Sequence, residues 1–275
     1  MSIQDKFSLK GRTAVVTGGG GLLGAEFCKT LAEAGAAVVV ADLDADAARA
    51  VAAKLENEGR QATSFAADVT DPESIGELMR TVLNAFGGVD VLVNSAALDP
   101  KFDEGAVKTG IPPGGFEDYP LDAWNAALNV NLTGMFLVTQ ACVKSMLARG
   151  KRGSIINICS TYGLNGPDQR IYVDGGKRVA YKPVYYTVTK AGVLGFTKYL
   201  AAYYAGTEIR VNALTPGGVF NDHADYFVKN YATKTILGRM ARRDEMNGAL
   251  LFLASDASSY MTGSNLIVDG GWTAW

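Results

Sequence analysis

Thr17-Gly18-Gly19-Gly20-Gly21-Leu22-Leu23-Gly24 is the stretch of sequence that decides the fold. It follows a short apolar run at 13–17 and opens a segment of helical periodicity at 22–34. Gly19, Gly21 and Gly24 satisfy the pattern G-x-G-x-x-G in the strand-to-helix context that the pattern requires. Glycines at such a turn let the backbone approach a pyrophosphate, which then lies at the positive N-terminus of the helix. The stretch therefore predicts a dinucleotide site.

The rest of the chain repeats this unit of a strand followed by a helix, which is typical of a parallel sheet. We expect strands at 13–17, 37–41, 63–66, 89–93, 154–158, 210–214 and 266–268, and helices at 22–34, 45–58, 73–86, 121–148 and 184–204. Most of the strand runs are continuously apolar, as strands covered by helices on both faces are. The predicted fold is α/β: a Rossmann doubly wound parallel sheet of about seven strands with helices on both faces.

Composition limits the class of protein. The chain has 275 residues, of which 48% are hydrophobic and 20% charged, so it is long enough for one large domain spanning 1–275. Its formal net charge is −2, without a basic cluster, so we expect neither nucleic acid nor an anionic membrane as a partner. We expect no apolar run to reach membrane-spanning length. A small-molecule substrate and a cytoplasmic location are the expectations that follow.

The cysteines and the histidine exclude several kinds of site. Cys28, Cys142 and Cys159 are odd in number and widely spaced, which fits neither a disulfide framework nor a zinc site. The single histidine, His223, cannot form a two-histidine metal site and argues against a His-dependent triad. We therefore expect reduced, buried cysteines and no metal.

Asp42 indicates which dinucleotide binds. It closes the second predicted strand, eighteen residues after Gly24. An acidic side chain there can accept hydrogen bonds from the ribose hydroxyls of NAD and would repel the 2′-phosphate of NADP. No Arg or Lys occurs at 13–28 or at 34–48. NAD is therefore favoured over NADP.

Tyr186 and Lys190 lie four residues apart in the predicted helix 184–204, so their side chains share one face. To act as a base at neutral pH, a tyrosine must have its pKa lowered from about 10 by roughly 3, or about 4 kcal/mol. One cation about 4 Å away, at an effective dielectric near 20, supplies a free energy of that order. The two residues are a candidate acid–base pair, with an ordinary helix-surface contact as the alternative. Tyr185 lies five residues from Lys190 and points off the shared face.

Further segments, together with the glycine loop and Tyr186/Lys190, resemble the short-chain dehydrogenase/reductase family over essentially the whole chain. Asp68-Val69 resembles the adenine-contacting pair of the family, and Asn94-Ser95-Ala96-Ala97 stands where the family has Asn-Asn-Ala-Gly. The other matching segments are Asn131-Leu132-Thr133-Gly134, Ile158-Cys159-Ser160-Thr161-Tyr162-Gly163, Pro216-Gly217 and Val268-Asp269-Gly270-Gly271.

The resemblance implies hydride transfer between a nicotinamide and a secondary alcohol or ketone. Tyr186 would be the general acid/base, and Lys190 would lower its pKa and hold the nicotinamide ribose. Ser160 would hydrogen-bond the substrate oxygen, and Asn131 would anchor a water that relays the proton. Besides Tyr186 and Lys190, the implied cofactor-binding residues are Gly18, Gly20, Gly21, Leu22, Leu23, Gly24, Asp42, Leu43, Asp68, Val69, Asn94, Ala96, Pro216, Gly217 and Val219.

Three segments outside the regular units bear on the substrate. These are the excursions 99–120 and 165–182 and a lid at 217–242, in which we expect His223 to be solvated. One or more of four basic residues of the insertion 165–182 are expected to meet an anionic or polyhydroxylated ligand such as a sugar acid, and the alternative is that they are solvated surface charges. They are Arg170, Lys177, Arg178 and Lys182, with Lys101 and Lys108 as further candidates. Tyr162 is a candidate for lining the site, with a packing role as the alternative.

Two other functions stay open. The spacing Thr17-Gly18-x-x-Gly21-x-x-Gly24 also resembles that of longer relatives that epimerise or dehydrate nucleotide sugars with recycled NAD. A non-catalytic NAD-binding sensor would use the same fold, although the complete Ser, Tyr and Lys set favours an enzyme. In the family, the helix after Pro183 and the C-terminal strand pair with other subunits. The resemblance therefore implies a homotetramer, with a dimer as the alternative.

Overall fold

The computed structural model describes residues 2–99, 115–150 and 152–275. Its main element is a parallel sheet of seven strands in the order β3-β2-β1-β4-β5-β8-β9. The strands are β1 (Thr13–Thr17), β2 (Ala37–Asp42), β3 (Ala62–Ala66), β4 (Val91–Asn94), β5 (Arg152–Ile158), β8 (Glu208–Pro216) and β9 (Asn265–Val268). The predicted Rossmann-type fold is confirmed. The strand order reverses between β1 and β4, which is where such sheets bind ligands.

Helices connect the strands. They are α1 (Leu22–Glu33), α2 (Ala45–Asn57), α3 (Pro72–Phe86), α5 (Leu121–Leu128), α6 (Met135–Ala148), α7 (Val184–Tyr203), α8 (Asp225–Ala232) and α9 (Asn247–Ala254). A π-helical segment, Asn129–Gly134, joins α5 to α6. Asp44 and Asp71 cap α2 and α3 by accepting hydrogen bonds from the first free N–H groups of each helix.

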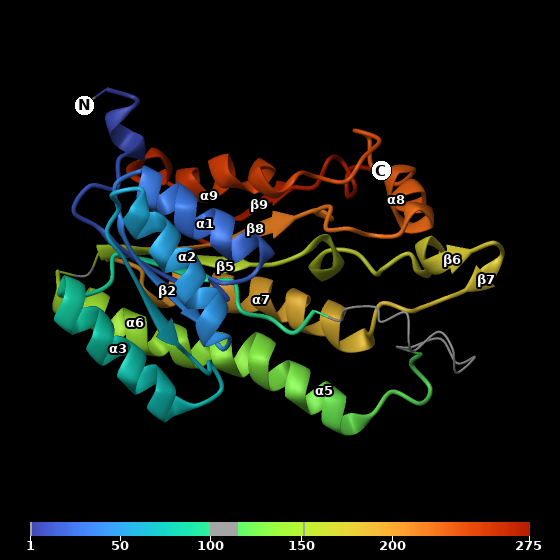
Figure 1. Cartoon of the computed structure of the whole chain (residues 1–275), viewed down its shortest axis with the longest axis horizontal. Helices are drawn as coiled ribbons and strands as arrows, with labels where there is room; N and C mark the ends of the chain where they lie inside the picture. Colours follow the sequence, from blue (N-terminus) through green and yellow to red (C-terminus); the bar gives the residue numbers. More distant parts are fainter. Residues whose placement is uncertain (1, 100–114, 151) are drawn as a thin grey trace.

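Two hydrophobic layers form the core, one on each face of the sheet. Side chains alternate along each strand: Ala14 and Val16 of β1 pack in one layer and Val15 in the other. The first layer contains buried residues of α1, α2 and α9, and the second contains buried residues of α3, α6 and α7. Figure 1 shows α1 and α9 above the sheet and α3, α6 and α7 below it, with α2 crossing in front. The alternation explains why the strands are apolar throughout.

The helix Leu121–Ala148 corrects one expectation. Its 28 residues have a mean hydropathy of 1.4 in the most apolar window, so by length and composition it could cross a membrane. The expectation that no segment reaches this length is therefore wrong. However, Val138, Cys142 and Met146 of α6 are buried in the second layer against α3 and the sheet. This packing is that of a core helix.

The insertion and the lid lie together at the carboxyl ends of the strands. Within the insertion, Gln169–Tyr172 forms a 3-10 turn, and β6 (Val173–Asp174) pairs antiparallel with β7 (Lys177–Arg178). Figure 1 shows this hairpin and α8 projecting together at one end of the molecule. Asn230 of α8 joins them by donating hydrogen bonds to the carbonyls of Ile171 and Val173, at 3.1 and 3.0 Å.

A buried amide network fastens the sheet beneath this end. Asn94 Nδ2 donates to Asn157 Oδ1 at 2.8 Å and to Thr139 Oγ1 at 2.9 Å. Asn157 Nδ2 in turn donates to Thr197 Oγ1 at 3.0 Å. The network thus joins β4 and β5 to α6 and α7. It also shows that the side chain of Asn94, one of the predicted cofactor-binding residues, points into the core.

Asn157→Ala should lower the free energy of unfolding by roughly 2–4 kcal/mol, because it leaves buried polar groups unpaired and opens a cavity. Urea denaturation measures the change. Asn57→Ala, on the exposed end of α2, is the control and should change stability by less than about 0.5 kcal/mol. Equal effects of the two substitutions would contradict this account.

Candidate active site

The glycine loop between β1 and α1 is closely packed. Gly18 has a φ of +66°, and a Cβ on it would lie 2.9 Å from Ala96 Cα, in the segment after β4. A Cβ on Gly24 would lie 1.9 Å from the Gly18 carbonyl oxygen. Neither position can carry a side chain without moving the loop. The loop therefore presents bare backbone at the N-terminus of α1, which suits a pyrophosphate. Leu22 and Leu23 begin that helix and are half-buried.

Asp42 lies beside this loop. Its Oδ2 accepts a hydrogen bond from the Gly20 N–H at 2.9 Å, and its Oδ1 accepts one from the Asp44 N–H at 3.0 Å. These bonds fix the carboxylate at the edge of the loop. Each oxygen keeps a second lone pair, so the group can still accept hydrogen bonds from a ribose. Leu43 follows with 73% of its surface exposed. The residues present fit an adenosine ribose.

The next predicted contacts lie after β3. Asp68 Oδ1 accepts hydrogen bonds from the Thr70 backbone N–H and hydroxyl, at 2.8 and 2.7 Å, and these bonds lower the pKa of Asp68. Val69 is buried against Gly134, where a Cβ would meet Val69 Cγ2 at 2.6 Å. The structure thus places an ionised carboxylate here, and next to it a residue packed against the π-helical segment.

Ser160, Tyr186 and Lys190 converge from two elements. Ser160 follows β5, while Tyr186 and Lys190 share one face of α7. The Ser160 hydroxyl hydrogen-bonds the Tyr186 phenol. Lys190 is buried, donates to the Ile158 carbonyl at 2.9 Å, and has its Nζ 5.7 Å from the centre of the Tyr186 ring. The predicted catalytic side chains thus form one cluster.

The sequence suggested that Lys190 alone sets the pKa of Tyr186, but other influences act on it in the structure. Burial raises the pKa of Tyr186 well above 10, and the negative charge of Asp99 raises it further. The leading influence that lowers this pKa is the hydrogen bond from Ser160. Burial also lowers the pKa of Lys190. Asp99 was not singled out from the sequence as a site residue, because nothing in the pattern places it near Tyr186.

Asn131 lies in the π-helical segment, a local geometry frequent at functional sites. Its Oδ1 accepts a hydrogen bond from the Leu98 N–H at 2.7 Å, and its Nδ2 donates to Thr189 Oγ1 at 3.1 Å. The side chain therefore ties the segment after β4 to α7. Its contact on α7, Thr189, directly precedes Lys190, and the role of Asn131 in a proton relay stays a prediction.

The basic residues of the insertion separate into two groups. Arg170 is exposed and pairs with Asp168 through two hydrogen bonds of 2.8 and 2.9 Å. Lys177 is exposed on β7, and Arg178 stacks on Tyr181. Only Lys182 reaches the cluster, with its Nζ 3.8 Å from the centre of the Tyr186 ring. The candidates Lys101 and Lys108 lie outside the described residues.

Aromatic side chains enclose the cluster on the side of the lid. Tyr162 packs edge-on against both Tyr186 and Trp272, with ring centres 6.4 and 6.1 Å apart. Trp272 stacks on Tyr231, whose hydroxyl accepts a hydrogen bond from the Gly218 N–H. Burial raises the pKa of Tyr231 to about 12, so the phenol is neutral. The sequence indicated Tyr162 but not this continuous aromatic cluster.

The lid is joined to the sheet at its base. The Gly217 N–H, next to Pro216, donates to the Val268 carbonyl at 2.9 Å, and Val219 forms a β-bridge with Ala241. His223 stacks on Phe227 with ring centres 5.1 Å apart and is half-buried. His223, expected to be solvated, is therefore only partly exposed, because Phe227 covers one face of its ring.

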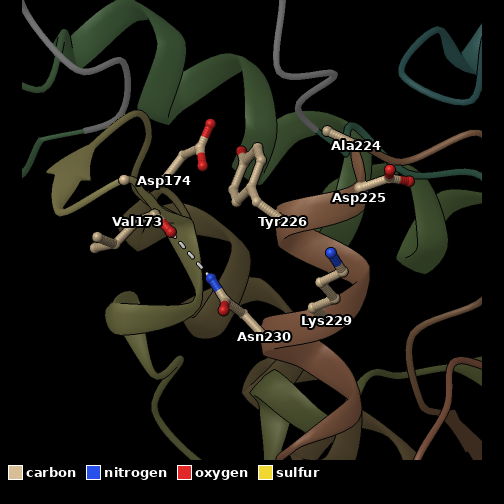
Figure 2. Close-up of a pocket in the computed structure, with 8 residues that line it drawn as sticks. Val173, Asp174, Ala224, Asp225, Tyr226, Lys229 and Asn230 are labelled. Carbon is tan, nitrogen blue, oxygen red and sulfur yellow. Dashed lines mark hydrogen bonds between the residues drawn. The ribbon is translucent and has the colours of Figure 1, made fainter.

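A cavity of about 600 Å³ lies apart from the cluster, between the β6–β7 hairpin and α8. Figure 2 shows Asp174 and Val173 on one side of it and Tyr226, Lys229 and Asn230 on the other. None of Ser160, Tyr186 and Lys190 lines it. The Ser160–Tyr186–Lys190 cluster, where the chemistry-bearing groups meet, is therefore the candidate reaction centre.

Comparison with known proteins agrees with the family that the sequence motifs resemble. A family model described as enoyl-(acyl carrier protein) reductase matches residues 22–273. The chain belongs to the short-chain dehydrogenase/reductase family. A 3-alpha-(or 20-beta)-hydroxysteroid dehydrogenase of Mycobacterium tuberculosis is 38% identical over 266 residues, which cover 97% of this chain and 91% of that protein. The family predicted from the sequence is confirmed, and the chain is an oxidoreductase of the type that acts on secondary alcohols.

Two solved structures of the family bear on the cofactor. A gluconate 5-dehydrogenase from Burkholderia cenocepacia, in complex with NADP and tartrate, has a TM-score of 0.85 and 32% identity, and the match covers 100% of both chains. A short-chain dehydrogenase from Leptospira borgpetersenii with bound NAD+ has a TM-score of 0.80 and 33% identity, covering 99% of this chain and 96% of that one. A nicotinamide cofactor is common to both.

Asp99→Asn should shift the pH at which the oxidation rate rises to a lower value. The Asp99 charge raises the pKa of Tyr186, so its removal lowers that pKa, and the phenolate then forms at lower pH. The pH profile of kcat/KM for a secondary alcohol measures the shift. Asp174→Asn, which removes a carboxylate of β6, should leave the profile in place. A profile that stays fixed or moves to higher pH in Asp99→Asn would refute the assignment.

Proposed function

We propose that the protein is an NAD-dependent dehydrogenase/reductase that interconverts a secondary alcohol and a ketone. The observation that carries this proposal is the convergence of Ser160, Tyr186 and Lys190 at the carboxyl end of the sheet. That end also holds the glycine loop, whose Gly18 packs against Ala96 across the reversal of strand order. A dinucleotide on the loop and a substrate at Tyr186 would lie on the same edge of the sheet.

Each side chain has a defined part in the proposed reaction. During oxidation Tyr186, as phenolate, takes the hydroxyl proton of the substrate, and during reduction the phenol returns it. Ser160 hydrogen-bonds the substrate oxygen and steadies the charge that develops there. Lys190, buried and fixed to Ile158, provides a positive charge beside the phenolate. The nicotinamide ring, when bound, accepts or gives the hydride.

The cofactor would be held by the chain's own backbone and carboxylates. The glycine loop and the start of α1 suit the pyrophosphate, and Asp42 and Asp68 suit the adenosine end. Pro216, Gly217 and Val219 at the base of the lid, with Lys190, suit the nicotinamide end. Asn131 would help pass the proton onward from Tyr186 along α7.

Tyr186→Phe should reduce kcat at least a hundredfold while leaving NAD binding within about twofold, because general acid–base catalysis is lost and packing is kept. Steady-state kinetics and NADH fluorescence titration measure the two quantities. Tyr185→Phe is the matched control, since Tyr185 is a neighbouring phenol that packs against Tyr119 instead of the cluster. Substantial turnover by Tyr186→Phe would disprove the mechanism.

NAD is proposed as the cofactor because of Asp42, whose fixed carboxylate would lie where NADP carries a phosphate. The wild type should have a higher kcat/KM with NAD than with NADP. Asp42→Ala should lower the ratio of kcat/KM with NAD to kcat/KM with NADP by about tenfold or more. The reason is that a hydrogen bond to a charged group contributes roughly 1.5–3 kcal/mol. Asp44→Ala removes the cap of α2 and should lower stability without changing the ratio. A wild type that favours NADP would refute this choice.

A sugar, sugar acid or related polyhydroxylated compound is the proposed substrate. Support comes from Lys182 at the reaction centre and from the likeness to a gluconate 5-dehydrogenase solved with tartrate. The aromatic cluster of Tyr162, Tyr231 and Trp272 adds flat apolar surfaces beside the site. Screening sugar acids and polyols for NADH formation is the direct test.

The proposed assembly is a homotetramer in the cytoplasm. Exposed apolar and aromatic side chains on α5, α6, α7 and β9 support association between subunits. They are Leu121, Phe136, Leu147, Val188, Tyr199, Tyr203 and Ile267. Cys28, Cys142 and Cys159 are free and buried, which suits a reducing compartment.

A further inference from the structure

Lys182 is a buried cation at the face of the proposed acid/base. Its Nζ lies 3.8 Å from the centre of the Tyr186 ring and 5.9 Å from that of Tyr162, a favourable placement for an ammonium over aromatic faces. Its side chain is only 9% exposed. The same Nζ donates to Asp99 Oδ1 at 2.6 Å. The ion pair therefore joins the segment after β4 to the insertion, next to the reaction centre.

The main chain of Lys182 is also fixed. The Lys182 N–H donates to Gln169 Oε1 at 2.9 Å, and Gln169 Nε2 donates to the Lys182 carbonyl at 3.0 Å. Gln169 begins the 3-10 turn of the insertion, and its own carbonyl accepts a hydrogen bond from Arg178. The insertion thus sets where Lys182 enters the site. Pro183, which directly follows, caps α7, so Lys182 and Tyr186 keep their relative position.

The two members of the ion pair differ in exposure. Lys182 is 9% exposed at its side chain, whereas Asp99 is 58% exposed. A buried ammonium needs an anion beside it, because removing the partner leaves an uncompensated charge out of water. An exposed carboxylate loses little when it leaves such a pair and returns to water. Within this ion pair, Asp99 is therefore the member that another carboxylate can replace.

We propose that Lys182 is the binding residue for a carboxylate of the substrate, and that Asp99 occupies Lys182 until the substrate carboxylate replaces it. This inference rests on the proposed function and names its substrate class: hydroxy acids that carry the reacting hydroxyl a few bonds from the carboxylate. With the reacting oxygen at Tyr186 and Ser160, the acid end of the substrate would extend over the Tyr186 ring to Lys182. A neutral alcohol would leave the Lys182–Asp99 pair in place.

Gluconate and glucitol are suitable probes, because they differ only in a carboxylate replaced by a hydroxymethyl group. Each is titrated into the enzyme with NADH bound, and NADH fluorescence is followed at one neutral pH. The wild type should bind gluconate about tenfold or more tightly than glucitol. Lys182→Met should weaken gluconate binding by about tenfold or more and leave glucitol within twofold, as loss of a charged hydrogen bond predicts.

Asp99→Asn provides the reciprocal test, because it removes the competing carboxylate. It should bind gluconate several-fold more tightly than the wild type does, while the Lys182→Met/Asp99→Asn double variant should bind no better than Lys182→Met alone. Lys234→Met is the matched control: it breaks a Lys–Asp pair of similar length, 2.7 Å to Asp168, away from Tyr186. This control should retain wild-type gluconate binding.

The inference is overturned if Lys182→Met and Lys234→Met bind gluconate equally, or if Asp99→Asn weakens gluconate binding. Those results would leave the proposed function intact as long as the wild type oxidises a neutral secondary alcohol with NAD. Absence of NAD-linked oxidation across polyols and hydroxy acids would instead reject the proposed function. The titration reports binding without turnover, so the two failures are distinguishable.

Discussion

The close approach of the Gly18 backbone to Ala96 is the constraint on which the rest of this structure depends. These residues follow β1 and β4, the neighbouring strands between which the strand order reverses, and a single Cβ on Gly18 would meet Ala96 Cα at 2.9 Å. Because the backbones meet there, the N-terminus of α1 faces the edge of the sheet. The segment after β4 then runs toward Asn131, which holds Leu98 by its backbone. Cofactor loop and reaction centre are thereby placed on one edge.

Burial is the largest influence on the charges of the candidate reaction centre. It raises the pKa of Tyr186 and lowers that of Lys190, so each group favours its neutral form more than it would in water. Charges and hydrogen bonds in such a place act strongly because little water screens them. The pKa of Tyr186 is therefore set first by burial, then by the negative charge of Asp99 and the hydrogen bond from Ser160. One Tyr–Lys pair does not determine it.

The sequence predicted the fold and the candidate catalytic cluster because both depend on local patterns. Apolar runs and glycines locate β1, α1 and the loop, and the four-residue spacing places Tyr186 and Lys190 on one face of α7. Contacts between distant segments left no such pattern. Asp99 meets Lys182 across 83 positions, and Asn94 turns inward to Asn157 across 63. Arg170 and Lys182 were equal candidates for binding a ligand in the sequence, but Arg170 is exposed and pairs with Asp168.

The insertion lies between two fixed residues of the site, Ser160 and Tyr186. Its own length and sequence can change without moving either residue. Ser160 is fixed by β5, and Tyr186 is fixed by α7, whose first residue follows Pro183. The chain between them can therefore lengthen without altering the hydrogen bond that joins the two side chains. What the insertion does change is the surroundings of that bond, since it brings in Lys182 and Tyr172 and packs against α8. The groups proposed to carry the chemistry therefore belong to the sheet and α7, whereas Lys182, the residue proposed to select the substrate, belongs to the insertion.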